Sequence, residues 1–446
     1  MKAFIEKCHY SEKQGICNEK MELSGKPDNI KVEMNVVNVY PELSDQIFEG
    51  FGGAITDSSV KVLMKLPDEK RKNVLRRYFG ENGIGYSRLR LPLDSCDFSE
   101  DQYAAAQDWH AGENNIFEFS SEEREQIKLI NEIYEIAGEK LPVLLCPWSP
   151  LAVMKDNKDR IGGKLLKERY NDFADYMCAY ILELRRCGIN VESVTIQNEQ
   201  NAWQTWDSCL YSEEEELDFI VNSLVPAFNA HGLEYIDIYL WDHNKERVVE
   251  RAMNGFSKAG DKVKGIAFHW YTGDHFDAIR AVHERFPEKK LSHTEGCVEL
   301  SRYHEATEQM NAVRYAHDII GDLENGTNSY YDWNIVLDET GGPNYVGNYC
   351  DAPILVDINR DECIERLSFK YIGMISRYVR KGALRLVSTI YDSDIDHTAF
   401  KNTDGSISLI MLNRKDSAQK IFCRMDGNCY EFEIEAGEIA GILFIQ

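Results

Sequence analysis

The chain has 446 residues, of which 43% are hydrophobic and 28% are charged. This composition is typical of a globular protein with enough apolar material for a large core. Acidic residues outnumber basic ones by 75 to 50, giving a formal charge of −25, which disfavours nucleic acid and anionic membranes as partners because phosphate binding needs clustered basic charge.

The sequence carries no visible targeting or membrane signal. Its N-terminus, MKAFIEKCHYSEKQGICNEK, lacks the apolar segment of a secretory signal. No run of 18 or more apolar residues occurs, so we expect no transmembrane segment. Twelve cysteines are scattered without a C-x-x-C pair, which favours reduced thiols and a cytoplasmic location.

In chain order, the first predicted element is an alternating apolar and polar stretch at 30–40, typical of an antiparallel strand. Short β-rich runs separated by helical patterns follow. The eight runs are IFEGFGGA (47–54), GYSRLRLPL (85–93), LPVLLCPW (141–148), VESVTIQN (191–198), YIDIYLWD (235–242), VKGIAFHW (263–270), KKLSHTEG (289–296) and SYYDWNIVLD (329–338).

The clearest helical pattern lies between the third and fourth runs, at 171–188. Its apolar residues recur at helical spacing from Phe173 to Leu184, giving one continuous stripe. Arg185 and Arg186 suit the last turn of a helix, and Gly188 suits its end. After the eighth run, much of 383–446 alternates again, with turn signals at Asp404-Gly405 and Asp426-Gly427.

Eight strands alternating with helices predict a (β/α)₈ TIM barrel, here placed at 46–382. The alternating ends of the chain, 1–45 and 383–446, predict an attached antiparallel β-sandwich built from both termini. The fold class is therefore α/β. The glycine cluster at 50–53 resembles a dinucleotide-binding loop, but no acidic partner follows at the required distance. Close backbone packing at the start of the barrel accounts for it better, and no cofactor is expected.

In such barrels the chemistry sits at the C-terminal ends of the strands. The fourth run ends in Asn198-Glu199 and the seventh in Thr294-Glu295, so two carboxylates are expected at one mouth. Histidine, amide and aromatic side chains end other runs. Paired carboxylates with aromatic walls suit glycoside hydrolysis, in which one group is protonated and the other ionised. His269 and His275 lack a third ligand at metal spacing, so no catalytic metal is predicted.

Seven motifs give the chain a resemblance to glycoside hydrolase family 30, the glucosylceramidase family, over nearly its full length. They are GFGGAITDSS (50–59), RLPLDSCDFS (90–99), PWSP (147–150), TIQNE (195–199), FHWY (268–271), TEGC (294–297) and DWNIVLDETGGPNY (332–345). The resemblance implies a barrel with an attached β-sandwich and a retaining mechanism.

The same resemblance implies a role for each matching residue. Glu199 would be the general acid/base and Glu295 the nucleophile. Arg90 would support these carboxylates, and His269 and Tyr271 would flank the nucleophile. The residues expected to bind sugar hydroxyls or line the pocket are Asp97, Trp148, Asn198, Trp333 and Asn344.

Proton donation requires the pKa of Glu199 to be raised in the free enzyme, and we expect the nearby negative charge of Glu295 and aromatic burial to raise it. Trp203 and Trp206 follow on the same loop, where they either wall the leaving-group subsite or pack under a neighbouring helix.

The function implied is an exo-acting β-glucosidase resembling the glucosylceramidases, with a β-glycoside or oligosaccharide as its partner. A β-1,6-glucanase or β-xylosidase of the same family is an alternative, and a catalytically inactive carbohydrate-binding protein is an alternative of another class. Gln200 stands where family members usually carry proline, and the lipid-contacting loops have no clear match. The leaving group and the oligomeric state are therefore left open.

Overall fold

The computed structural model describes residues 2–11, 13, 15–28 and 34–445. Eight parallel strands close into a barrel, with the neighbour order β10-β11-β12-β5-β6-β7-β8-β9. They are β5 (Gly50–Ala54), β6 (Tyr86–Leu93), β7 (Val143–Pro147), β8 (Val191–Thr195), β9 (Asp237–Asn244), β10 (Gly265–His269), β11 (Lys290–Glu295) and β12 (Ser329–Asp332). Seven of them lie within the predicted runs, and β9 extends two residues beyond its run of 235–242, so the predicted TIM barrel is confirmed.

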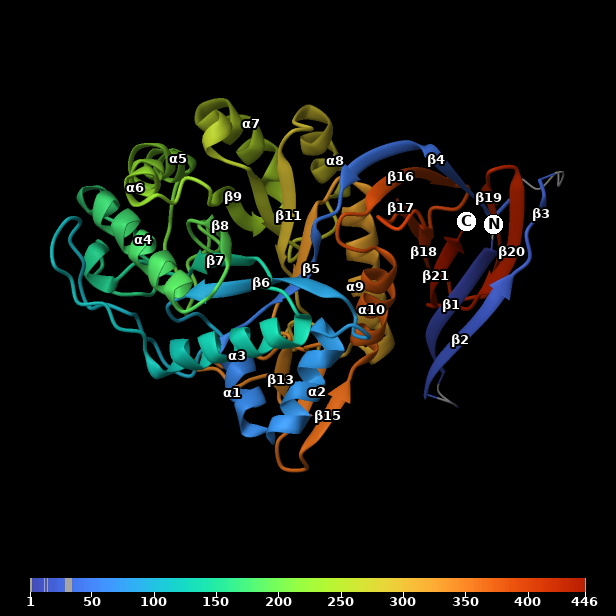
Figure 1. Cartoon of the computed structure of the whole chain (residues 1–446), viewed down its shortest axis with the longest axis horizontal. Coiled ribbons are helices and arrows are strands. Elements are labelled where there is room, and N and C mark those ends of the chain that lie inside the picture. Colours follow the sequence, from blue (N-terminus) through green and yellow to red (C-terminus); the bar gives the residue numbers. More distant parts are fainter. Residues whose placement is uncertain (1, 12, 14, 29–33, 446) are drawn as a thin grey trace.

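Helices surround the barrel, most of them between consecutive strands (Figure 1). The predicted helix at 171–188 is α4 (Tyr170–Arg186), and its apolar stripe from Phe173 to Leu184 is buried. The other α-helices are α1 (Asp57–Lys65), α2 (Asp68–Phe79), α3 (Ser121–Ala137), α5 (Glu213–Phe219), α6 (Val225–His231), α7 (Val248–Ala259), α8 (Phe276–Arg285), α9 (Glu308–Glu324) and α10 (Leu367–Tyr378).

The prediction of one strand over 329–338 is wrong in its second half. Strand β12 ends at Asp332, and Asn334 takes a left-handed conformation with φ 56°. The Asn334 side chain accepts a hydrogen bond of 2.6 Å from Thr56, which holds the turn in place. Beyond the turn, the chain joins a separate three-stranded sheet of β13 (Val336–Asp338), β14 (Ile354–Asp357) and β15 (Glu362–Glu365).

Both ends of the chain build the attached β-sandwich. Its ten strands run in the order β2-β1-β21-β18-β17-β16-β4-β19-β20-β3. The N-terminal strands are β1 (Lys2–Ser11), β2 (Gly15–Leu23), β3 (Lys26–Pro27) and β4 (Val36–Ile47), and the C-terminal strands are β16 (Leu384–Ile390), β17 (Ile395–Lys401), β18 (Ile407–Asn413), β19 (Gln419–Met425), β20 (Asn428–Ile434) and β21 (Ile439–Ile445).

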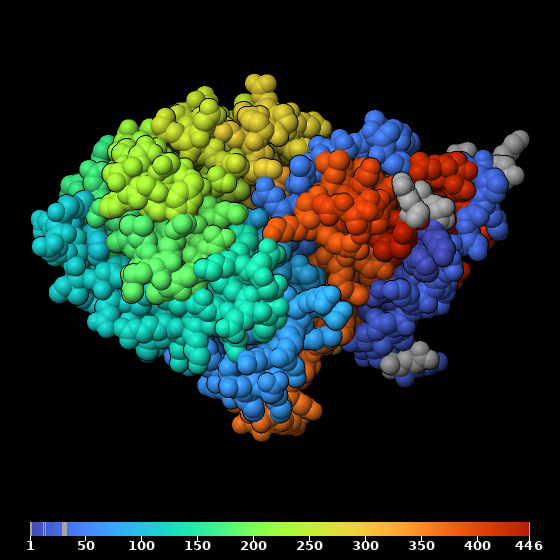
Figure 2. All heavy atoms as spheres, in the orientation of Figure 1, coloured from blue at the N-terminus to red at the C-terminus, as the bar shows by residue number. Residues whose placement is uncertain are grey.

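The strand expected at 30–40 is described here from Val36 onward, and residues 30–33 of it lie outside the described part. Strand β1 pairs antiparallel with β21, so the first and last segments lie side by side in one lobe (Figure 2). The predicted turn at Asp426-Gly427 joins β19 to β20 with positive φ at both residues, as a two-residue hairpin requires.

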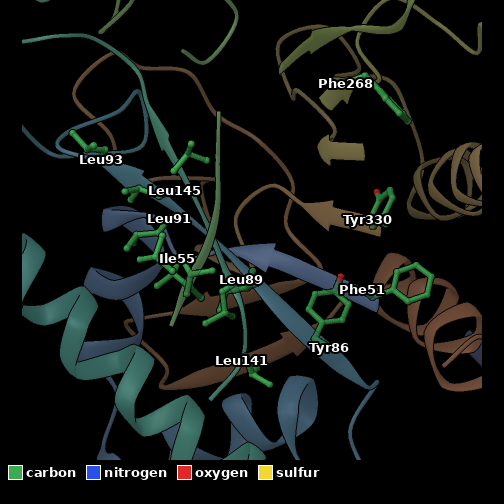
Figure 3. Packing of buried hydrophobic residues seen from close by; sticks show 14 of the residues in the cluster. Phe51, Ile55, Tyr86, Leu89, Leu91, Leu93, Leu141, Leu145, Phe268 and Tyr330 are labelled. Carbon is green, nitrogen blue, oxygen red and sulfur yellow. The ribbon is translucent and has the colours of Figure 1, made fainter. Parts of the chain in front are cut away.

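The core of the barrel explains the glycine cluster. A Cβ on Gly52 would lie 2.3 Å from the carbonyl oxygen of Arg88 on β6, so the two backbones approach too closely for any side chain. Apolar residues of β5 and β6 fill the adjoining space, and Figure 3 shows Leu89 and Leu91 close to Ile55. This packing fixes the strands whose C-terminal ends carry the site. Among the described residues, no helix is both long enough and apolar enough to cross a membrane.

Candidate active site

A cavity of about 300 Å³ opens at the C-terminal ends of the barrel strands. Six of the residues expected at the site line it: Asp97, Asn198, Glu199, Tyr271, Glu295 and Trp333. Three others, Arg90, Trp148 and His269, are buried behind the wall and contact the residues that line it. The fold therefore brings nine of the expected side chains together.

Asn344 is the exception. It does not line the cavity, and its side chain instead bonds the backbone of Asn348, donating to the carbonyl at 2.6 Å and accepting from the amide at 3.1 Å. Asn348 itself lines the cavity. Asn344 thus shapes the loop that presents Asn348.

Glu295 is the last residue of β11, and both of its oxygens are hydrogen-bonded. Arg90 donates to Oε2 at 2.5 Å, and the Tyr271 hydroxyl donates to Oε1 at 2.8 Å. Two donors, one of them the cationic guanidinium, thus bind this carboxylate. Glu295 faces the cavity with both oxygens fixed in position, as a nucleophile or a general base requires.

Arg90 connects this carboxylate to the rest of the site. Its other terminal nitrogen donates to Asn198 at 2.8 Å and to Asp242 at 3.1 Å. Two stacked tryptophans, Trp148 and Trp333, flank its guanidinium at 4.9 and 5.4 Å from their ring centres. A planar, always charged group with several donors suits such a buried junction better than lysine does.

Glu199 follows the end of β8 in a left-handed conformation, φ 51°. Its backbone amide donates to the Asp242 carbonyl at 3.0 Å, which fixes it against β9. Its Oε1 lies 3.3 Å from Nδ1 of His269 and 3.4 Å from Nδ1 of His243, while Gln204 donates to Oε2 at 3.3 Å. The carboxylate thus sits between two imidazoles.

These imidazoles overturn the expected protonation of Glu199. Burial raises the pKa of this carboxyl, but hydrogen bonds and charge from His243 and His269 outweigh burial and hold the pKa below its ordinary value. The expectation of a raised pKa rested on the repulsion from Glu295 and on burial, and it left out the histidines from β9 and β10. Glu199 is an anion in this resting arrangement.

Asp242 lies at the centre of the site and was not among the expected residues. It accepts hydrogen bonds from Thr195 at 2.7 Å and Thr294 at 2.5 Å, and it lies 3.1 Å from Nε2 of His269. Burial raises its pKa, but Arg90 and His269 outweigh burial and keep it well below the ordinary range. Asp242 is therefore a buried anion that orients His269 and Arg90.

His269 is the cationic counterpart of this anion. Burial lowers its pKa, but the carboxylates of Glu295, Asp242 and Glu199 outweigh burial and raise it to about 9. The imidazole accordingly holds a proton at neutral pH. Its two ring nitrogens connect Asp242 to Glu199.

The sequence did contain a signal for Asp242 and His243. The fifth predicted run, 235–242, ends at Asp242, and His243 follows it directly. The first and fifth runs are the two whose ends gave no expected site residue. Asn348 and Cys350 also line the cavity, but they belong to a loop beyond the barrel strands. The rule that functional residues follow barrel strands therefore does not predict them.

Asp97 Oδ1 and Trp148 Nε1 are among the buried polar atoms near the cavity that have no protein partner within the described residues. Burial, Glu295 and Glu199 raise the pKa of Asp97 well above its ordinary value. Buried polar groups are normally hydrogen-bonded, so each of these atoms is suited to a ligand hydroxyl.

The two tryptophans after Glu199 separate into different roles. Trp206 lines the cavity, whereas Trp203 is 66% exposed and lies outside it, with its indole against Gly162. Trp206 is thus part of the cavity wall, whereas Trp203 neither lines the cavity nor packs under a helix.

Comparison with known proteins gives two family matches in tandem. Residues 48–379 match the "Glycosyl hydrolase family 30 TIM-barrel domain", and residues 382–437 match the "Glycosyl hydrolase family 30 beta sandwich domain". Together the two matches cover the barrel and most of the C-terminal part of the sandwich.

Individual relatives agree with these matches. Mouse lysosomal acid glucosylceramidase is 30% identical over 401 residues, covering 85% of this chain and 77% of its own. The endo-1,6-β-D-glucanase of Neurospora crassa is 24% identical over 412 residues, covering 88% of this chain and 84% of its own. Among solved structures, SrfJ of Salmonella typhimurium is 34% identical with a TM-score of 0.94, and the endo-β1,6-glucanase BT3312 is 24% identical with a TM-score of 0.88, each over 100% of both chains.

Proposed function

The chain belongs to glycoside hydrolase family 30, and from this premise we propose that it is a retaining, exo-acting β-glucosidase with Glu295 as nucleophile and Glu199 as acid/base. The observation that carries the proposal is the pairing of two differently supported carboxylates in one cavity. Glu295 receives two strong donors, whereas Glu199 lies against two imidazoles, of which that of His269 can supply a proton.

The first step is attack by Glu295 on the anomeric carbon. One carboxylate oxygen forms the new bond while the bond to the leaving oxygen breaks, giving a covalent glycosyl-enzyme. Arg90 and Tyr271 hold the carboxylate in position before the attack. Retention requires carboxyl groups about 5–5.5 Å apart, so that no water fits between the attacking group and the sugar.

The leaving oxygen needs a proton, which we assign to the hydrogen bond between His269 and Glu199. An imidazolium next to a carboxylate holds the same number of protons as an imidazole next to a carboxylic acid. Movement of the proton from Nδ1 of His269 to Oε1 of Glu199 would therefore arm the acid without a proton from solvent. After esterification of Glu295, Glu199 takes a proton from the water that releases the sugar.

The sugar is placed by the buried polar atoms with no protein partner. Asp97 and Trp148 each offer an unpaired atom, and Asn198 lies beside Glu199, next to the expected position of the 2-hydroxyl. The glucosylceramidase relatives support a terminal β-glucoside as substrate. The leaving group would contact Gln204, Trp206 and Arg302, which line the same cavity.

A second candidate is an endo-acting β-1,6-glucanase. The full-length match to an endo-β1,6-glucanase structure favours it. The two candidates share the same carboxylates and differ in whether a second sugar extends beyond the one next to Glu295.

The test is a panel of aryl β-glycosides (glucoside, xyloside, galactoside and fucoside) with wild type and Glu295→Gln. Turnover of the glucoside that disappears in the variant is the expected result. If the folded protein turns over none of them but cleaves β-1,6-glucan, the exo assignment is wrong. If it cleaves neither, the catalytic proposal fails and a carbohydrate-binding role takes its place.

A further inference from the structure

Glu199, His243 and His269 bring three metal-binding atoms together on one side of the cavity, all within 4.8 Å of one another. Glu199 Oε1 lies 3.3 Å from Nδ1 of His269 and 3.4 Å from Nδ1 of His243. Two donors bound to one zinc ion at about 2.1 Å and a tetrahedral angle lie about 3.4 Å apart. Both edges from the carboxylate thus already have the spacing of a zinc site.

The surroundings of His269 complete the pattern. Its far nitrogen, Nε2, lies 3.1 Å from Asp242, which is fixed by two threonine hydroxyls. A histidine that binds a metal almost always donates its other N–H to a carboxylate or carbonyl, which sets the ring orientation. Nδ1 of His269 therefore points toward Glu199 with its orientation already fixed.

The cavity admits and attracts a cation. The side chains of Glu199 and His243 are each 12% exposed and line it, so an ion reaches them from solvent and water can fill a fourth position. The acidic residues lining it are Asp97, whose pKa is raised, together with Glu199, Glu295 and Glu299, and the only lysine or arginine among the described lining residues is Arg302. A cleft lined mainly by one sign of charge concentrates ions of the opposite sign.

A second group of potential ligands shows the contrast. His293, Asp318 and Asp322 also cluster, but the Lys245 ammonium lies 2.7 Å from both aspartates and occupies the place of a cation. Within the described part of the chain, no lysine or arginine forms an ion pair with Glu199. At the mouth of the barrel the only cation beside Glu199 among the described residues is thus a ligand itself, the imidazolium of His269, which can give up its proton to a metal ion.

We propose that Glu199, His243 and His269 bind one divalent transition-metal ion, with Zn²⁺ as the best fit, and that the bound ion inhibits hydrolysis. Two imidazoles and a carboxylate match the donor set of zinc sites that keep an open position, whereas Mg²⁺ and Ca²⁺ prefer oxygen ligands alone. The ion displaces the proton shared between His269 and Glu199, and that proton leaves to solvent. The inhibition rests on the proposed acid/base role of Glu199, while the binding does not.

The binding test is equilibrium dialysis of the full chain against Zn²⁺ after treatment with a chelator. Wild type is expected to retain one ion. His243→Asn is expected to lose affinity by at least about tenfold, because removal of an outer partner alone costs about 10–100-fold. The matched control is His275→Asn, at an exposed histidine outside the cavity whose left-handed backbone (φ 40°) suits asparagine.

Equal affinity in wild type and His243→Asn, or no bound ion in wild type, would overturn the site. The cavity thiols Cys297 and Cys350 offer a competing location. Co²⁺ in place of Zn²⁺ distinguishes them, since a thiolate ligand adds a strong charge-transfer band in the near ultraviolet. That band would assign the ion to the thiols and would also overturn the proposal.

The inhibition test uses the same samples with the glycoside that gives the fastest turnover. Zn²⁺ is expected to lower the rate at the concentration that fills the site, with recovery on addition of chelator. His243→Asn is expected to need at least about tenfold more Zn²⁺ for the same fractional loss. Binding without loss of rate overturns the inhibitory part, whereas a metal-free protein that hydrolyses no glycoside overturns the proposed function and leaves the dialysis result standing.

Discussion

At the scale of the residue, Arg90 donates hydrogen bonds to three side chains of the site. They are Glu295, Asn198 and Asp242. Arg90→Lys keeps the charge but removes the planar set of donors that reaches all three. We expect kcat on aryl glycosides to fall on the order of 10²–10³, the usual cost of losing an electrostatic donor at a reacting centre.

Arg88→Lys is the matched control for this prediction. Arg88 lies two residues earlier on the same strand, is also buried, and bonds Tyr331 and Glu192 away from the cavity. Its variant is expected to lower thermal stability and leave kcat nearly unchanged. Equal losses of kcat in the two variants would show that the Arg90 substitution lowers kcat by disturbing the barrel, and not by removing hydrogen bonds in the active site.

His269 governs the pH dependence of the same site. Its pKa is raised to about 9, so the protonated form lasts to higher pH than in a free histidine and is lost above about 9. Because we assign the donated proton to the His269–Glu199 pair, kcat/KM on a substrate with a poor leaving group should fall only above that pH. In His269→Gln the proton must reside on Glu199 itself, and the alkaline limb should move well below 9.

The measurement is a pH–rate profile for wild type, His269→Gln and the control His275→Gln, whose ring is exposed and outside the cavity. The titratable groups facing His269 include Glu199, Asp242, Glu295, His243 and Tyr271, and all remain in each variant. An alkaline limb that stays at the same pH in His269→Gln would contradict the assignment of the proton.

The positions of the two carboxylates were predictable from the sequence, but the protonation state of Glu199 was not. Glu199 and Glu295 were predictable because each lies at the C-terminal end of a buried β-rich run. The protonation of Glu199 was predicted wrongly, because it depends on two histidines from other strands, and a sequence does not show which side chains meet. The sequence shows that His243 directly follows the fifth run. It does not show that Nδ1 of His243 lies 3.4 Å from Oε1 of Glu199.

At the scale of the element, the barrel strands were the most predictable part of the fold. Parallel strands buried on both faces read as nearly continuous apolar runs, which separate clearly from amphipathic helices. The eighth run was extended too far because Ile335, Val336 and Leu337 continue the β-rich composition after Asn334 has turned the chain. Composition alone does not show such a turn.

Gly52 on β5 gives a prediction at this scale. A Cβ there would lie 2.3 Å from the Arg88 carbonyl, and backbone cannot move aside as a flexible side chain can. We expect Gly52→Ala to lower the free energy of unfolding by about 1–3 kcal/mol, as overpacking does, measured by urea denaturation. Gly427→Asn, in an open left-handed turn, is the control and should change it little. A stability of Gly52→Ala equal to wild type would show that β5 and β6 can separate.

At the scale of the whole molecule, the sandwich depends on pairing between the two ends of the chain. Strand β1 covers one edge of β21, whose Ile439, Ala440, Ile442 and Phe444 are buried. Gly441 of β21 packs against Met374 and Tyr378 of α10, so the sandwich contacts a helix of the barrel. The two parts therefore support each other.

Deletion of residues 1–27 removes β1, β2 and β3 and leaves β21 as an exposed apolar edge. Such edges pair with other chains, so we expect concentration-dependent association in light scattering and a lower thermal midpoint. Met21→Lys, an exposed position on β2, is the control and should remain like wild type. A deletion variant with the light scattering and thermal midpoint of wild type would contradict the proposed dependence.

The proposed double-displacement reaction passes through a sugar bound covalently to Glu295, and this intermediate can be trapped. The enzyme is incubated with a 2-deoxy-2-fluoro aryl glycoside of the preferred sugar, and the intact mass and the labelled peptide are measured. We expect one sugar per chain, attached to Glu295, and no label in Glu295→Gln. A label on another carboxylate, or a first product of inverted configuration without any label, would contradict it.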